Sequence, residues 1–289
     1  MSDHPHSHGE ASEEMSFLRA PGPSKLSSML LDPWNPISGQ HEEPSPTCLA
    51  RVQLEIARFY NARRSRGVFV VPEEYDLTKL HAVVVGPKDT PYEGGFFHFL
   101  LKCPSNYPAS PPRVRNLTTD AGRVCFHPDL CASGTVCLDI LGTCPGQPSW
   151  KPAQGNIETV LASIQSLLNK TTCFEESGPG DASRYDAVIQ HETIRVAVCD
   201  VVEACLAGKS PCPPPLRQKI LKAFSERYGW YEKVVGDRVH LDGTVMDCLF
   251  GGSKGVYQYR SLLQRLRLLN VQLHMRDPTL VGKGVAARF

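Results

Sequence analysis

The chain has 289 residues, 41% of them apolar, which is enough for one large core or one core with appendages. Its 31 basic and 30 acidic residues leave a formal charge of +1, so no net field attracts it to nucleic acid or anionic lipid. Residues 1–14 are too polar for a signal peptide, and no apolar run approaches the roughly 18 residues that span a bilayer. We therefore expect a cytoplasmic and nuclear protein with no membrane or nucleic-acid partner.

Residues 1–45 are rich in Pro, Ser, Gly, His and Glu and poor in aliphatic residues, which predicts a disordered tail. From Thr47 onward, apolar residues recur on one helical face and arginines lie elsewhere, which predicts a basic amphipathic helix. Four segments rich in β-branched and aromatic residues then predict strands at 68–71, 80–85, 96–102 and 113–118. Their short spacing favours an antiparallel meander.

Residues 119–151 contain many Gly, Pro and Cys and form a long irregular segment of the kind that is often functional. Apolar periodicity returns afterwards and predicts four helices. These helices span Ala153–Leu168, Ala182–Ala207, Leu216–Val235 and Tyr257–Met275, with a Gly-rich connector at 236–255. The pattern as a whole predicts the α+β class.

Four motifs follow one another from the second strand onward. They are Gly-Pro-Lys-Asp-Thr-Pro-Tyr-Glu-Gly-Gly-Phe-Phe (86–97), Tyr-Pro-Ala-Ser-Pro-Pro (107–112), His-Pro-Asp (127–129) and Gly-Thr-Val-Cys-Leu-Asp-Ile-Leu (134–141). In order and spacing they closely resemble the ubiquitin-conjugating enzymes, over roughly residues 47–200. The resemblance implies the ubiquitin-conjugating (UBC) fold over residues 46–200. Residues 201–289 would form a helical extension, too apolar to be a tail and therefore packed on the core.

By this resemblance, Cys137 is the thiol that accepts ubiquitin or a ubiquitin-like modifier from an activating enzyme and passes it to a lysine or a ligase. Exchange of one thioester for another is nearly isoenergetic, so loading needs only a nucleophile, an approach path and oxyanion support. Transfer to a lysine also needs an acid or base near the amine. The upstream enzyme spends the ATP, so we expect no metal or cofactor here.

His127 resembles the histidine of the family's His-Pro-Asn tripeptide, and we predict that it braces the loop. The family's Asn is thought to donate to the oxyanion or to brace the loop, but this chain has Asp129 there. An ionised carboxylate has no donor and repels an oxyanion. Three interpretations remain: a slower enzyme, an Asp129 that only braces the loop, or a substitute donor elsewhere.

The family also places an acidic side chain near the thiol to orient or deprotonate the lysine. We call this side chain the acidic gate. After Leu168 this chain is shorter than the family's segment, so several carboxylates are candidates for the gate. These are Asp139, Glu175 and Glu176, each of which could equally be a solvated surface carboxylate.

Docking surfaces also follow from the resemblance. The first helix presents basic residues to the activating enzyme, which implicates Arg51 and Arg58, although a merely solvated basic face is an even alternative. The ligase surface is expected at Tyr107, Pro108, Ala109, Pro152 and Ala153. Ala109 stands where the family usually has a bulky apolar residue, so ligases are expected to bind weakly.

Two other classes of protein compete with this interpretation. Cys125, His127, Cys131, Cys137 and Cys144 could form a zinc knuckle, but structural zinc sites usually pair ligands two to four residues apart on tight turns. A non-catalytic interaction module would explain the departures from the family's pattern. The presence of the acceptor cysteine argues against such a module.

Overall fold

The computed structural model describes residues 35–36, 43–61, 67–143, 150–169, 179–246 and 255–277. The tail predicted for residues 1–45 lies outside this range except at 35–36 and 43–45. The strands form one block with helices before and after it, as the predicted α+β class requires. In chain order the elements are α2 (Pro46–Asn61), β1 (Val68–Glu73), β2 (Asp76–Val85), β3 (Phe96–Lys102), β4 (Arg113–Asn116), η1 (Asp139–Leu141), α3 (Ile157–Leu167), α4 (Pro179–Glu192), η2 (Thr193–Asp200), α5 (Val201–Leu206), α6 (Pro214–Gly236), η3 (Val239–Leu241) and α7 (Tyr259–Arg276).

The four strands form one antiparallel sheet in the order β1-β2-β3-β4, which is the predicted meander. In its middle, Val70 pairs with Ala82, which pairs with Phe99 on the next strand. Strand β4 is shorter than predicted and ends at Asn116. The reason is local, because the Asn116 side chain accepts a hydrogen bond from the Thr118 N–H at 3.0 Å and turns the chain.

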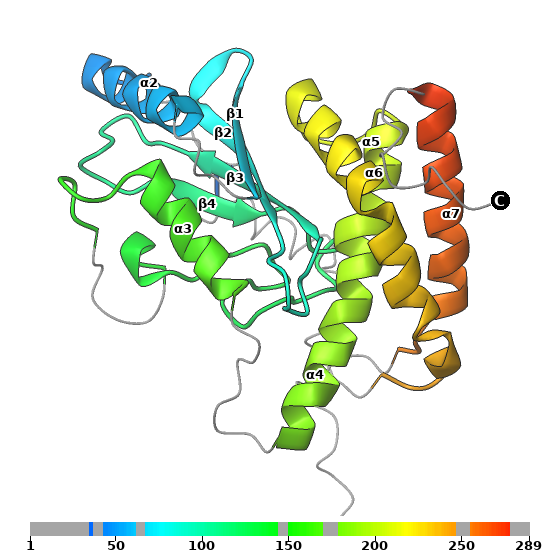
Figure 1. Cartoon of the computed structure of the whole chain (residues 1–289). Coiled ribbons are helices and arrows are strands. Elements are labelled where there is room, and N and C mark those ends of the chain that lie inside the picture. The colour runs from blue at the N-terminus through cyan, green and yellow to red at the C-terminus, as the bar shows by residue number, and fades with distance from the viewer. Residues whose placement is uncertain are drawn as a thin grey trace, which may run out of the picture.

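Both faces of the sheet are buried. This explains why the sequences of its central strands are continuously apolar and do not alternate between apolar and polar residues. Val70, Ala82 and Phe99 belong to a first core shared with α2, α3 and the loop that carries Cys137. Val83 and Phe96 belong to a second core shared with the helices from α4 to α7. Figure 1 shows the sheet lying between α2 and α3 on one side and α5, α6 and α7 on the other.

The helix predicted over Ala182–Ala207 begins earlier and is not uniform. α4 passes directly into η2, a π-helix, and then into α5. Such helices are rare, and here the segment supplies both cores: Val196 packs in the first and Val198 in the second. A segment that faces two cores has apolar residues nearly all round. The predicted boundary at residue 200 falls inside this continuous helical run.

The helices beyond residue 200 contact the sheet and its loops. The Tyr231 hydroxyl on α6 donates to the Gly94 carbonyl at 2.7 Å. Gly94 has a φ of +73°, and a Cβ there would approach the Tyr231 ring to 2.9 Å, so the contact requires a glycine. The Lys219 ammonium lies 5.1 Å from the centre of the Phe69 ring on β1. These contacts hold α6 against the sheet.

Helix α3 begins at Ile157 rather than at the predicted Ala153. Asn156 caps it, because the Asn156 side chain accepts from the Thr159 N–H and the Thr159 side chain accepts from the Asn156 N–H. Pro152 and its neighbour therefore remain on the loop before the helix, where they are exposed.

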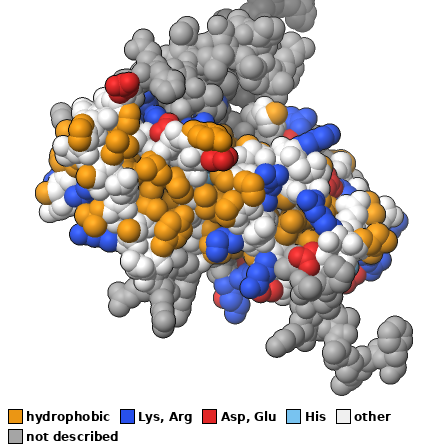
Figure 2. Space-filling view, turned by 90° about the horizontal axis from the view of Figure 1, so that it is seen from above, with side chains coloured by type: hydrophobic (Ala, Val, Ile, Leu, Met, Phe, Trp, Pro, Cys, Tyr) orange, Lys and Arg blue, Asp and Glu red, His pale blue; other side chains and the backbone are white. Residues whose placement is uncertain are grey.

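The surface seen from above in Figure 2 has apolar side chains gathered on the half that carries α2 and the β1–β2 hairpin. Exposed large apolar side chains of these elements include Leu54 and Tyr60 on α2 and Tyr75 and Leu77 on the hairpin. Helix α2 thus presents apolar as well as basic side chains to solvent. Among the described residues, no helix is long and apolar enough to cross a membrane.

Candidate active site

Cys137 lies on the loop between β4 and η1. Its neighbours Val136 and Leu138 are buried in the first core, whereas Cys137 itself is half-buried. Successive side chains of an extended segment point in opposite directions, so anchoring both neighbours turns the thiol outward. The apolar Val-Cys-Leu sequence therefore directs the thiol without burying it.

Thr143 holds the backbone on both sides of Cys137. Its hydroxyl donates to the Val136 carbonyl at 2.7 Å and accepts from the Leu138 N–H at 2.9 Å, and its carbonyl accepts from the Cys137 thiol at 3.3 Å. The chain turns back because Gly142 has a left-handed φ of 67° at the end of η1. Thr143 was not among the predicted residues. Gly142 was the one signal in the sequence that could have indicated this turn.

The His127-Pro128-Asp129 loop lies directly against Cys137. The Cys137 N–H donates to the Asp129 carbonyl at 2.8 Å. His127 is only 3% exposed, and its Nδ1 accepts from the Asp129 N–H at 3.1 Å. This bond occupies the Nδ1 lone pair and fixes the turn, which is the geometry that loop bracing requires.

The Asp129 carboxylate is 42% exposed, in contrast to the buried imidazole beside it. The two backbone N–H groups nearest the thiol along the chain both donate elsewhere: Cys137 to Asp129 and Leu138 to Thr143. In this arrangement neither amide supplies the substitute donor considered for the oxyanion. Of the two amides and the side chain at position 129, only that side chain could therefore stabilise the oxyanion.

The three candidates for an acidic gate differ in what the structure says of them. Asp139 is exposed and begins η1 just after Cys137, so a carboxylate does lie next to the thiol along the chain. Glu175 and Glu176 lie outside the described residues.

Glu55 joins three parts of the molecule around the site, although it was not among the predicted residues. It is 7% exposed, and its Oε2 accepts from the Tyr107 hydroxyl at 2.7 Å and from the Ile157 N–H at 2.9 Å. Burial, together with the hydrogen bond to Glu55, raises the pKa of Tyr107 well above its usual range. Arg51 is ion-paired with Glu55 one turn away on α2. Of the two predicted docking arginines, only Arg58 is exposed.

Trp150 connects the two segments predicted to contact ligases. Its indole N–H donates to the Pro108 carbonyl at 2.8 Å, and its ring centre lies 6.1 Å from that of Tyr107. Tyr107 is itself buried, so it supports this surface from below. The exposed side chains next to the contact along the chain include Ala109, Lys151, Pro152 and Ala153.

The described cysteines of the zinc alternative are not grouped into a metal site. The thiols of Cys125, Cys131 and Cys137 each donate to a different backbone carbonyl. Among the described residues, no three His, Cys, Asp or Glu side chains are grouped so that they could hold a metal ion. Cys144 lies outside the described residues.

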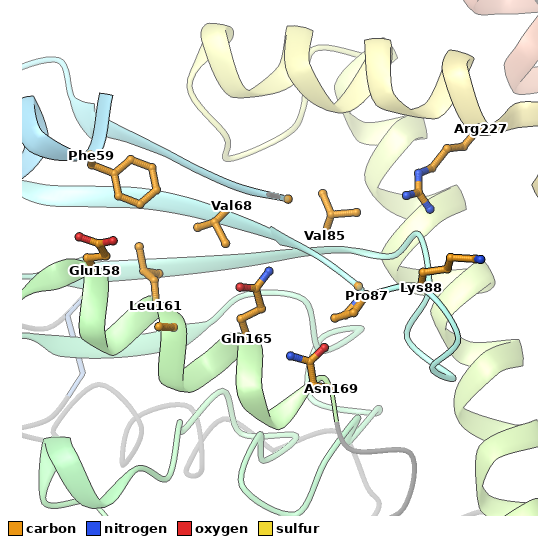
Figure 3. Close-up of a pocket in the computed structure, with 13 residues that line it drawn as sticks. Phe59, Val68, Val85, Pro87, Lys88, Glu158, Leu161, Gln165, Asn169 and Arg227 are labelled. Carbon is orange, nitrogen blue, oxygen red and sulfur yellow. The ribbon is translucent and has the colours of Figure 1, made fainter. Parts of the chain in front are cut away.

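A hollow of about 530 Å³ lies between α3, the sheet and α6. In Figure 3, Leu161 and Gln165 of α3 point toward the strands that carry Val68 and Val85, with Lys88 and Arg227 at one end of the hollow. None of the predicted site residues within the described ranges lines this hollow.

Comparison with known proteins agrees with the predicted fold and family. The family model "Ubiquitin-conjugating enzyme" matches residues 51–196. The chain belongs to the ubiquitin-conjugating enzyme family, and it is a transferase of the kind that forms thioester intermediates. Ubiquitin, an activating enzyme and ligases are the partners that this family implies.

Individual relatives extend the similarity beyond the family model. The chain is 45% identical over 258 residues to ubiquitin-conjugating enzyme E2 Z of Homo sapiens, covering 86% of this chain and 71% of that protein. It is 44% identical over 263 residues to ubiquitin-conjugating enzyme E2 Z of Xenopus tropicalis, covering 89% and 82%. A probable ubiquitin-conjugating enzyme, protein 17 of Caenorhabditis elegans, is 36% identical over 164 residues, covering 51% and 22%. These names favour the enzyme over the non-catalytic module.

Proposed function

We propose that Cys137 takes ubiquitin or a ubiquitin-like modifier as a thioester, and that the chain is an enzyme of the E2 Z type. The observation that carries the proposal is the placement of Cys137. Its thiol is half-buried between two buried neighbours, and its backbone is held by Asp129 and Thr143. A positioned thiol with a docking surface is sufficient for loading, because the exchange is nearly isoenergetic.

The reaction has two halves. In loading, the Cys137 sulfur attacks the modifier's thioester carbonyl and expels the thiol of the activating enzyme. In discharge, a lysine amine attacks the new thioester, loses a proton and expels the Cys137 sulfur. The Asp129 carboxylate offers no donor to the oxyanion of either step. Discharge also requires removal of a proton from the lysine amine, so we expect it to be the slower half.

We assign docking of the activating enzyme to the exposed face of α2. Arg58 is exposed there, and Leu54, also exposed, adds an apolar contact. Arg51 contributes through its ion pair with Glu55, which keeps α2 in place beside α3. Since the chain's net charge is only +1, the attraction is local rather than global.

We assign ligase binding to the surface formed by Pro108, Ala109, Pro152 and Ala153, with Tyr107 beneath it. Trp150 holds the two segments together through the bond to Pro108. A methyl group at position 109 fills little of a partner's pocket, and truncated interface anchors cost about 2 kcal/mol or more. We therefore expect weak ligase binding.

We infer that the protein works in the cytoplasm and nucleus. The eight described cysteines are all free, and those at positions 48, 103, 199, 205 and 212 are buried. Buried free thiols of this kind are typical of a reducing compartment.

Incubation with an activating enzyme, ATP and ubiquitin tests the proposal. We expect a covalent adduct that a thiol reductant removes and that Cys137→Ala lacks. Cys131→Ala is the matched control, because that cysteine lies on the same loop and is also partly exposed. Adduct formation by Cys137→Ala, or none by the wild type with a panel of activating enzymes and modifiers, would contradict the assignment.

A further inference from the structure

A second cavity, of about 570 Å³, is lined in part by residues 120–132 of the loop that leads to Cys137. We call it the extension pocket. Three parts of the chain line it: the active-site loop, α4 and the segment before α7. Representative lining residues are Cys125, Pro128 and Ala132 from the loop, Tyr185, Val188 and Ile189 from α4, and Met246, Gly255 and Val256 from the extension.

The walls of the extension pocket are held together by hydrogen bonds. The Tyr185 hydroxyl donates to the Phe126 carbonyl at 3.0 Å, which ties α4 to the active-site loop. The buried ring of His191 accepts from the Gln258 N–H at 3.0 Å, which ties α4 to the extension. The extension wall is a short ladder in which the Met246 N–H donates to the Gly255 carbonyl at 2.8 Å. A cavity with fixed walls binds without a large ordering cost.

The charged residues at the pocket neutralise one another. Arg195 bonds Asp120 at 2.8 Å and is also paired with Glu192, and Asp120 is paired with Arg123 as well. Although burial raises the pKa of Asp120, the bonds from the two arginines hold it below its usual value. Apart from Cys125 and Gln258, the groups left to recognise a ligand are apolar side chains, so the ligand that fits best is an apolar side chain.

The location of the pocket identifies which protein supplies that side chain. Pro128 lines the pocket, and the next residue, Asp129, accepts from the Cys137 N–H at 2.8 Å. A peptide whose side chain fills the pocket can therefore place a lysine a few residues away at the thioester, since an extended chain advances about 3.3–3.6 Å per residue. The acceptor protein must bring its lysine to this thioester. The extension wall lies outside the matched family segment, residues 51–196, so it adds a contact surface that the family model does not include.

We propose that the extension pocket binds an apolar side chain of the acceptor protein, a few residues from the lysine that is modified. This rests on the proposed function of Cys137. The pocket would select acceptors by sequence, whereas the thiol alone would accept any lysine amine that reaches it.

The proposal is tested by measuring discharge from the full chain, preloaded with ubiquitin, to a set of peptides. Each peptide carries one lysine, and each of the four positions on either side of it is varied among leucine, phenylalanine, serine and aspartate. We expect an aliphatic or aromatic residue at one position to speed discharge roughly tenfold over serine there. Val256→Arg should abolish this preference, because Val256 is 42% exposed and lines the pocket. A second pocket variant, Met246→Gln, should reduce it.

Val245→Arg is the matched control. Val245 bridges to Val256, is 61% exposed and does not line the pocket, so its substitution should leave the peptide preference intact. Loading by the activating enzyme and discharge to free lysine should be unchanged in all three variants. The absence of any apolar preference in the wild type would overturn the proposal. A preference that survives Val256→Arg would also overturn it. A Val256→Arg defect confined to loading would overturn it as well, because it would assign the pocket to the carried modifier. A wild type that never loads overturns the proposed function instead.

Discussion

Replacing Asp129 by asparagine is expected to speed discharge of ubiquitin from Cys137 to free lysine by roughly 10²-fold, because an oxyanion donor typically contributes a factor of this size. The backbone already places position 129 beside the thiol, through the bond from the Cys137 N–H to the Asp129 carbonyl at 2.8 Å. The His127 imidazole accepts from the backbone N–H at 129 and holds the turn whichever side chain stands there. An asparagine amide would therefore add a donor without rearranging the loop.

The rate should be measured as single-turnover discharge at matched thioester loading. Asp129→Ala separates two effects, since it removes the repulsive carboxylate without adding a donor. We expect its gain to be well below that of Asp129→Asn. A rate for Asp129→Asn that equals or falls below the wild-type rate would show that Asp129 only braces the loop.

Replacing Glu55 by alanine is expected to lower the free energy of unfolding by about 3 kcal/mol, because breaking a buried charged network leaves its partners unpaired. Tyr107, Ile157 and Arg51 would all lose their bond to this carboxylate. Glu55→Gln keeps an oxygen acceptor of the same shape and should cost less, about 1–2 kcal/mol.

Urea unfolding followed by tryptophan fluorescence measures both changes. Glu158→Ala is the control, because Glu158 is exposed at the start of α3, next to the amide that Glu55 binds. It should shift stability by less than about 0.5 kcal/mol. A Glu55→Ala cost as small as that of Glu158→Ala would mean that the bonds around Glu55 do not hold α2, the Tyr107 loop and α3 together.

The parts of the fold that sequence predicts are those governed by local pattern. The four strands and the helices on either side of them follow from apolar periodicity and from Gly and Pro at their ends. The thiol loop follows from the order of the four motifs, because Val136 and Leu138 anchor the segment in the core on their own. The position of Cys137 could therefore be predicted from sequence.

The parts that were missed depend on contacts between distant residues. Glu55 has the polar character of a surface residue, yet its partners lie 52 and 102 residues away. The π-helix at η2 faces two cores, and only the assembled fold defines the second core. Arg51 was predicted to dock a partner from the resemblance alone. Its ion pair with Glu55 could not be predicted, because that pair depends on the burial of Glu55.

The most direct test of the account is the chemical nature of the bond at position 137. Cys137→Ser, incubated with an activating enzyme, ATP and ubiquitin, should form an oxygen ester that survives a thiol reductant and is cleaved by hydroxide. The wild-type adduct should be cleaved by both reagents. An adduct of Cys137→Ser that the reductant still removes would place the thioester on another cysteine and contradict the account.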